Sequence, residues 1–206
     1  MARYTGAKNR IARKFGVNVF GKGRNPMAHK PNPPGMHGAS RKKKSDFGMQ
    51  LQEKQKLAAC YGMISRKQMV RYYREAARRA ENTHEEFLSL LECRLDTVVC
   101  RLKFASTIFQ AQQLVSHGHV LVDGKKVDIR SFQVKPGMKV SIREKSRTMS
   151  GIKHSLERSA IEVPEYLSLD GPKMTGELVV KPHVDQVALP MPVNVALVCE
   201  FLAHTS

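Results

Sequence analysis

Two apolar patterns of different period follow each other between residues 91 and 143, and together they limit the folds open to this chain. The first pattern recurs at three- and four-residue steps, the spacing of one helical face, and it occurs twice. Its members are Leu91, Leu95, Val98, Val99 and Leu102 in one helix, then Phe109, Ala111, Leu114 and Val115 in a second that Ser106 or Thr107 can cap. Residues 120–127 then flank Asp123-Gly124, a pair typical of a tight hairpin because both turn positions need positive φ. With a last strand at Lys139–Ile142, the region is predicted to be a helix, helix, hairpin unit.

Three short motifs in this unit match, in order and spacing, a small RNA-binding module. They are residues 94–96 (Arg-Leu-Asp), residues 114–118 (Leu-Val-Ser-His-Gly) and residues 120–124. The unit therefore resembles the module named after bacterial small-subunit ribosomal protein four. The resemblance implies that the two helices present basic side chains to structured RNA while the hairpin supports them. Several RNA-modifying enzymes carry the same module, so the module alone leaves the function open.

Positive charge is concentrated at the start of the chain. Residues 1–44 hold 12 of the 35 Lys and Arg residues and none of the 18 Asp and Glu residues. A net charge of +17 points to a polyanionic partner, with nucleic acid the first candidate. Gly and Pro interrupt this segment and its apolar residues are too sparse for a core, so we expect a basic arm that is largely disordered when free. A solvated tail is the alternative, but arginines interleaved with Tyr4, Phe15 and Phe20 favour a segment that folds on RNA.

Capping signals mark helices on either side of the central unit. Ser45 can cap a first helix, residues 65–68 have the Ser-x-x-Gln form of a capping box, and Thr83 can begin a third helix. Asn194 is the expected cap of a last apolar helix that must dock on other helices, because it is too hydrophobic to stand alone in water.

Arg71, Arg74 and Arg78 share one outer face of the predicted second helix, at three- and four-residue steps. A solvated face with local pairing to Glu75 is the alternative interpretation, and such pairing stabilises a helix by only tenths of a kcal/mol. Beside a basic arm, we expect these arginines to contact phosphate.

The predicted fold class is α+β, with a basic N-terminal arm, a small helical domain and an RNA-binding domain of helices packed on a short antiparallel or mixed β-sheet. The expected boundaries are 1–44 for the basic extended arm, 45–91 for the helical domain, 92–157 for the RNA-binding module and 158–193 for a β extension of the RNA-binding domain. A C-terminal helix at 194–203 is expected to pack back on the helical domain.

Segments outside the module match the same ribosomal family. Examples are residues 1–6 (MARYTG), residues 34–38 (PGMHG), residues 45–48 (SDFG) and residues 192–194 (PVN). The match covers essentially the whole chain, so the sequence is identified as a member of the family of bacterial small-subunit (30S) ribosomal protein four. The resemblance implies a structural, non-enzymatic protein that is a primary binder of 16S rRNA and nucleates assembly of the subunit body. It further implies neighbouring small-subunit proteins and mRNA as partners, roles at the messenger entry path and in translational accuracy, and a monomer within the cytoplasmic ribosome.

The predicted RNA-binding residues are basic and lie in the arm, the helical domain and the module. They are Arg3, Lys8, Arg10, Arg13, Lys14, Arg41, Lys42, Lys43, Lys44, Arg71, Arg74, Arg78, Arg94, Arg101, His117, Lys125 and Lys126. Ile108 and Gln112 stand where the family usually has arginines, which predicts weaker RNA contact on the second module helix.

No catalytic residue, metal site, cofactor or membrane segment is predicted. The four cysteines form no Cys-x-x-Cys pair, and no apolar run approaches the ~20 residues of a membrane span. Without a signal-peptide pattern at the N-terminus, a cytoplasmic protein is expected.

Two alternative functions start from the same residues. Pseudouridine synthases, which are RNA-modifying enzymes that can carry this module, use an Arg-Leu-Asp motif with a nucleophilic aspartate, and Asp96 occupies that position. Because residues 97–99 continue an apolar helical stripe, we expect Asp96 instead to be a helix-surface carboxylate that orients Arg94 or Arg101. A DNA-binding helix-turn-helix protein is the second alternative. A long basic arm favours convoluted RNA over duplex DNA as the ligand.

Overall fold

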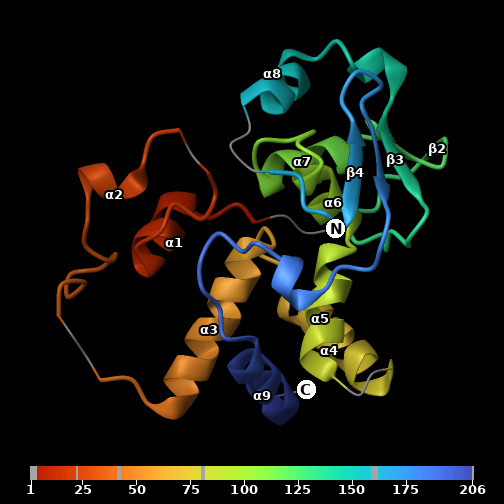
Figure 1. Ribbon diagram of the computed structural model, residues 1–206. Coiled ribbons are helices and arrows are strands. Elements are labelled where there is room, and N and C mark those ends of the chain that lie inside the picture. Colours follow the sequence, from red (N-terminus) through yellow and green to blue (C-terminus); the bar gives the residue numbers. More distant parts are fainter. Residues whose placement is uncertain (1–3, 22, 41–42, 80–81, 159–161, 206) are drawn as a thin grey trace. The chain divides into compact units, whose positions relative to one another are not determined.

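The computed structural model describes residues 4–21, 23–40, 43–79, 82–158 and 162–205 (Figure 1). The chain divides into two compact units, one formed by Met1–His84 with Leu189–Ser206 and the other by Glu85–Ala188. Helices and one β-sheet make up the described elements, so the predicted α+β class is confirmed.

Helices make up the first unit. In chain order they are α1 (Lys8–Phe15), α2 (Pro26–His29), α3 (Asp46–Cys60), α4 (Arg66–Arg79) and α9 (Val195–Thr205). The Ser45 hydroxyl accepts the amide of Gly48, and the Ser65 hydroxyl accepts the amide of Gln68, so the caps predicted for α3 and α4 are confirmed.

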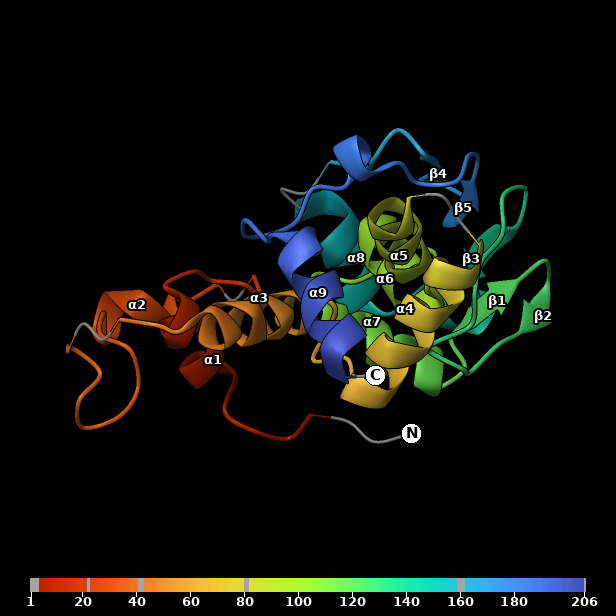
Figure 2. The ribbon, with the colours of Figure 1, turned by 90° about the horizontal axis from the view of Figure 1, so that it is seen from below.

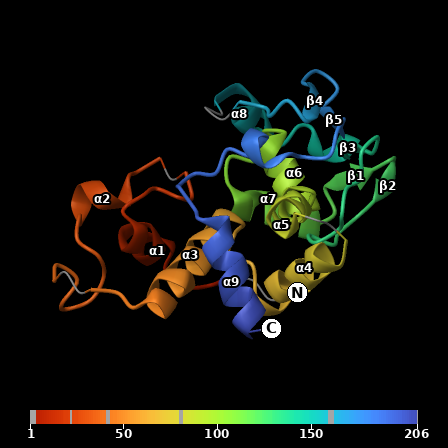
Figure 3. The ribbon, with the colours of Figure 1, turned by 60° about the horizontal axis from the view of Figure 1, so that its bottom comes forward.

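Helix α9 lies beside α3 in both views of Figures 2 and 3. The rings of Phe47 and Phe201 are 5.5 Å apart between centroids, and the backbone amide of Asn194 donates to Glu53 Oε2 at 2.9 Å. Asn194 also caps α9 by accepting the amide of Leu197, as predicted. Apolar side chains on one face of α9 are thereby removed from water, which explains why so hydrophobic a helix is stable at the end of the chain.

The arm differs from the expectation of a segment without a core. Gly16 ends α1 in the left-handed conformation at φ 68°, and its amide donates to the carbonyl of Ala12. Ala12, Val19 and Phe20 are buried. The sequence spacing of these residues is irregular, so no periodic pattern predicts their burial.

The second unit contains the sheet and the helices packed on it. Its elements are α5 (Thr83–Glu92, which begins at the boundary), α6 (Leu95–Arg101), α7 (Ile108–Ser116), β1 (Val120–Val122), β2 (Lys125–Lys126), β3 (Lys139–Ile142), α8 (Ser150–Arg158), β4 (Leu167–Asp170) and β5 (Thr175–Leu178). Within the described residues, five strands form one antiparallel sheet in the order β2-β1-β3-β5-β4. The core lies between this sheet and helices α6 and α7, with Leu95, Val115 and Ile142 fully buried.

The first predicted module helix is in fact two helices. The apolar stripe continues from α5 into α6, but the backbone leaves the helical path at Cys93 and Arg94. There the chain pairs with the segment before β3, since the amide of Val134 donates to the carbonyl of Cys93 and Arg94 forms a β-bridge with Gln133. Tertiary hydrogen bonds thus interrupt a helix that the side-chain period alone would continue.

The helix cap and the hairpin turn predicted for the module are confirmed. The Thr107 hydroxyl caps α7. Asp123 and Gly124 have φ values of 46° and 77°, and the predicted hairpin turn requires positive φ at both positions. The β extension expected at 158–193 contains β4 and β5, and Gly176 of β5 pairs with Val140 in the middle of the sheet.

Gly176 is required where α6 ends against β5. A Cβ at this position would lie 2.3 Å from Leu102 Cδ2, and Leu102 is fully buried and cannot swing away. We therefore expect Gly176→Ala to lower the free energy of unfolding by about 1–3 kcal/mol through overpacking. Gly171→Ala is the control in the same hairpin, because a Cβ added there would meet nothing within 4 Å. Equal urea midpoints for the two variants would contradict this account.

Candidate nucleic-acid interface

One face of α4 is apolar and buried, and the other is cationic and exposed. Met69, Tyr72 and Ala76 are buried at three- and four-residue steps, which fixes the rotation of the helix. The exposed face carries a row of basic side chains, hereafter the α4 cation row: Lys67, Arg71, Arg74 and Arg78.

Among the described residues, no carboxylate forms an ion pair with the α4 cation row. The acidic side chain of α4 itself, Glu75, instead pairs with Arg79 at 2.8 Å. Lys67 precedes Arg71 by four residues, and Arg74 precedes Arg78 by four, so like charges face each other along the helix. Such pairs destabilise a helix by tenths of a kcal/mol each, a cost that a polyanion along this face would remove. Charge complementarity therefore favours phosphate as the partner.

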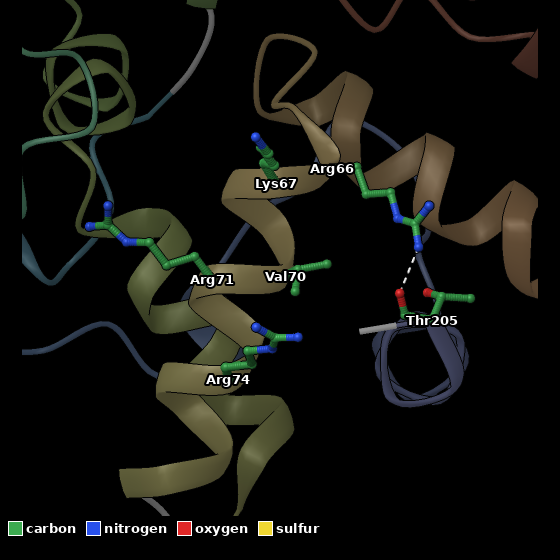
Figure 4. A pocket seen from close by; sticks show the side chains of 6 residues that line it. All are labelled: Arg66, Lys67, Val70, Arg71, Arg74 and Thr205. Atoms are coloured by element: carbon green, nitrogen blue, oxygen red, sulfur yellow. Dashed lines mark hydrogen bonds between the residues drawn. The ribbon is translucent and has the colours of Figure 1, made fainter.

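Lys67 is not one of the site residues predicted from the sequence, and the structure places it in the same row as three that are. The sequence does carry a signal for it, because Lys67 lies four residues before Arg71. Arg66 adds a further cation at the start of α4, where its Nη2 donates to the carbonyl of Thr205 at 2.6 Å (Figure 4).

The second unit presents separate cations at its sheet edge. Lys125 and Lys126 form β2, the outermost strand, and both are exposed. Gly118 has φ +72°, and a Cβ there would lie 2.3 Å from Lys126 Cε, so this glycine both ends α7 and leaves room for the lysine stem. His117, next to it, is exposed, with its ring 6.1 Å from that of His119. The predicted residues His117, Lys125 and Lys126 can therefore reach a ligand at this edge.

Arg94 is buried and Arg101 is part-buried, whereas the prediction from the sequence has both as surface RNA ligands. The Arg94 side chain is 3% exposed and donates from Nε and Nη2 to the two carboxylate oxygens of Asp96, at 3.0 and 2.8 Å. The Arg101 side chain is 14% exposed and makes a similar two-point contact with Glu92, at 3.1 and 2.9 Å. Bidentate buried pairs of this kind commit both guanidinium groups to the fold. We therefore treat these two arginines as residues that hold the module together and not as RNA ligands.

The buried Glu92 is shared by a third donor. The Tyr166 hydroxyl donates to Glu92 Oε2 at 2.9 Å, which ties the segment before β4 to the end of α5. Burial first, and then the charge of Glu92, raise the pKa of Tyr166, so the phenol remains a donor.

Asp96 is fully buried, which corrects the expectation of a helix-surface carboxylate. Besides Arg94, it accepts the amide of Thr97 at 3.1 Å and the Gln112 side chain at 3.3 Å. Gln112 in turn accepts from Arg130 at 3.4 Å. A carboxylate held by these donors in a closed core is not available as a nucleophile, which argues against the pseudouridine-synthase alternative. Gln112 is buried, so the glutamine expected to replace an arginine of the family contacts Asp96 and Arg130 inside the module.

The predicted arm residues are distributed between surface and structure. Arg10, Lys14, Lys43 and Lys44 are exposed, while Lys8 and Arg13 are half-buried. Arg13 Nε donates to the carbonyls of Lys30 and Asn32, so this side chain ties α1 to the segment that follows α2. Three further predicted residues, Arg3, Arg41 and Lys42, lie outside the described residues.

In the described ranges, no group of three or more His, Cys, Asp or Glu side chains is placed to hold a metal ion. Every helix in those ranges is too short or too polar to span a membrane. The thiols of Cys93, Cys100 and Cys199 lie in apolar surroundings, and burial raises the pKa of Cys93 to about 11. These thiols are packing groups.

Comparison with known proteins matches both units. Residues 3–92 match the family described as ribosomal protein S4/S9 N-terminal domain, and residues 93–140 match the S4 domain. A protein of Protochlamydia amoebophila named small ribosomal subunit protein uS4 is 61% identical over 206 residues, which is 100% of both chains. Proteins with the same name from Chlamydia trachomatis serovar D and Chlamydia pneumoniae are 61% and 54% identical over 207 residues, with 99% of each chain covered.

Proposed function

Because this chain belongs to the small ribosomal subunit protein uS4 family, we propose that it is a structural protein of the small ribosomal subunit that binds 16S rRNA. The observation that carries the proposal is the α4 cation row, which leaves four exposed basic side chains on one helix face with no carboxylate paired to them in the described part of the chain. A row of this kind contacts a phosphate backbone, which positions the protein without reading sequence. The family is one of ribosomal proteins and not of enzymes, in agreement with the closed surroundings of Asp96.

The second unit contributes its own contact edge through His117, Lys125 and Lys126. Each unit thus has exposed cations of its own for RNA, whereas a chain that bound only through net charge would accept any polyanion. We therefore propose that the protein recognises a folded rRNA junction as a primary binder and nucleates assembly of the subunit body. We further propose that it contacts neighbouring small-subunit proteins and mRNA at the messenger entry path, and that it influences decoding accuracy. It would act as a monomer within the cytoplasmic ribosome.

Binding of the full chain to a transcript of the 5′ part of 16S rRNA tests the proposal, with excess duplex DNA as competitor. We expect retention of the transcript at physiological salt and only slow loss as DNA is added. Loss of the complex at modest DNA excess would instead favour the helix-turn-helix alternative. Co-sedimentation with small subunits and chemical footprinting of the bound RNA would then locate the contact.

The arm is expected to contribute a salt-dependent part of this affinity. Replacing the exposed Arg10 and Lys43 by glutamine should reduce the slope of log K against log salt by roughly 1–2, since each lost phosphate contact removes about 0.7–0.9. Substitution is preferable to deletion of the arm, because deletion would remove the packing of Ala12 and Phe20, which are buried.

The matched control for the arm neutralises two exposed cations that already have carboxylate partners, Arg79 with Glu75 and Lys173 with Asp170. Arg79→Gln with Lys173→Gln lowers the net charge equally and should leave the slope unchanged. If both double variants lose the same slope, total charge and not the arm governs the interaction.

A further inference from the structure

A cavity of about 490 Å³ lies in the first unit between α4 and the end of α9. This volume falls in the range of roughly 300–1,000 Å³ typical of small-molecule sites. Its lining combines cations, an aliphatic side chain and the last described residue of α9: Arg66, Lys67, Val70, Arg71, Arg74 and Thr205.

The side chains that line the cavity point in different directions. Figure 4 shows Val70 and Arg74 projecting from α4 toward the side on which Thr205 lies, while Arg66 bridges to the Thr205 carbonyl. Arg71 extends its guanidinium away from Thr205 in the same view. Val70 is half-buried and offers the aliphatic part of the lining. An apolar contact thus lies next to at least two guanidinium groups.

The charged side chains that line this cavity are all positive. Four of its six lining residues are Lys or Arg and none is acidic. Outside the lining, burial and then the positive charge of Arg66 lower the pKa of Lys54. An anion in the cavity would relieve the repulsion among the lining cations.

We propose that the cavity holds a single unpaired nucleotide of the bound RNA, with its base against Val70 and its phosphate on Arg74 and Arg66. The inference rests on the proposed function and adds a site for one nucleotide that leaves the base stack. Lys67 and Arg71 then contact the phosphates on either side. A phosphate alone would need only the cations, whereas Val70 and the cavity volume provide an apolar contact and room for a base as well.

The cavity in the arm, of about 520 Å³, is also basic but suits a ligand less well. Arg13, which lines it, donates to two backbone carbonyls where Arg66 donates to one, and no aliphatic side chain other than Pro26 lines its wall. The site beside α9 is therefore the better candidate for a base.

Thermal unfolding with adenosine 5′-monophosphate and with inorganic phosphate at the same millimolar concentration tests the site without any RNA. We expect the monophosphate to raise Tm by roughly 2–4 °C more than phosphate does. Val70→Phe fills the cavity without changing charge and should remove that difference, as should Arg74→Gln, which leaves Val70 intact. Arg79→Gln, on the same helix and paired with Glu75, is the charge-matched control and should retain the difference.

The same variants separate this inference from the proposed function when they are assayed with the 16S transcript. Val70→Phe should weaken binding roughly tenfold with an unchanged salt slope, and Arg74→Gln should weaken it and lower the slope by about one. Equal responses to the two small ligands, or wild-type RNA affinity in both variants, would overturn the nucleotide site while leaving the proposed function standing. If the unchanged chain prefers duplex DNA to the transcript, the proposed function fails and the nucleotide assignment fails with it.

Discussion

Replacing Glu92 by alanine should lower the free energy of unfolding by about 3–5 kcal/mol, the largest effect we expect from any single substitution in this chain. Glu92 is fully buried and accepts hydrogen bonds from Arg101 and Tyr166. Without the carboxylate, the largely buried guanidinium of Arg101 loses the counter-charge of Glu92, so the desolvation of that cation is compensated less. The urea midpoint of the full chain measures the loss.

Two further variants calibrate this result. Tyr166→Phe removes one hydrogen bond to Glu92 and should cost about 1 kcal/mol. Glu75→Ala breaks a pair with Arg79, whose side chain is 51% exposed, and should cost less than about 0.5 kcal/mol. A Glu92→Ala variant no less stable than Glu75→Ala would mean that the buried pair does not hold the module together.

Reversing the whole α4 cation row should abolish specific RNA binding. The variant carries Lys67→Glu, Arg71→Glu, Arg74→Glu and Arg78→Glu. It both removes phosphate contacts and adds repulsion, so we expect affinity for the 16S transcript to fall by roughly a hundredfold or more at physiological salt. All four side chains are exposed, and glutamate favours helix, so the fold should survive and circular dichroism should be unchanged.

The control for this reversal changes the same number of exposed lysines to glutamate in the second unit. They are Lys135, Lys145, Lys153 and Lys173. If affinity depends on the position of charge and not on its total, this control should bind much more tightly than the α4 variant. Equal losses would show that the α4 cation row has no special part in binding.

Local signals account for much of the fold that the sequence predicts correctly. The caps at Ser45, Ser65, Thr107 and Asn194 and the turn at Asp123 depend on neighbours a few residues away, and short-range chemistry suffices to find them. The exposed face of α4 is equally local, because a helix with buried residues at three- and four-residue steps must expose what lies opposite.

Arg94 and Arg101 show what the sequence could not reveal. In the sequence alone, an arginine next to an apolar stripe is read as an exposed cation. Tyr166, which completes the group around Glu92, is 74 residues further along the chain. The break between α5 and α6 has the same origin, since it depends on hydrogen bonds from residues 130–134. The ion partners Asp96 and Glu92 are near in the sequence, but the Tyr166 contact and the break between α5 and α6 depend on residues far along the chain.

The short helix in the arm bears on how quickly and how tightly this protein can engage its target. Because the eight residues of α1 are already helical, and Arg13 already ties α1 to the segment after α2, that part of the chain has fewer conformations left to lose on contact. Fixing one backbone residue costs about 1–2 kcal/mol, so preorganisation of even part of the arm is worth several orders of magnitude in affinity. The arm is then partly ordered before binding, so it meets a ribonucleoprotein surface in fewer conformations than a disordered segment would.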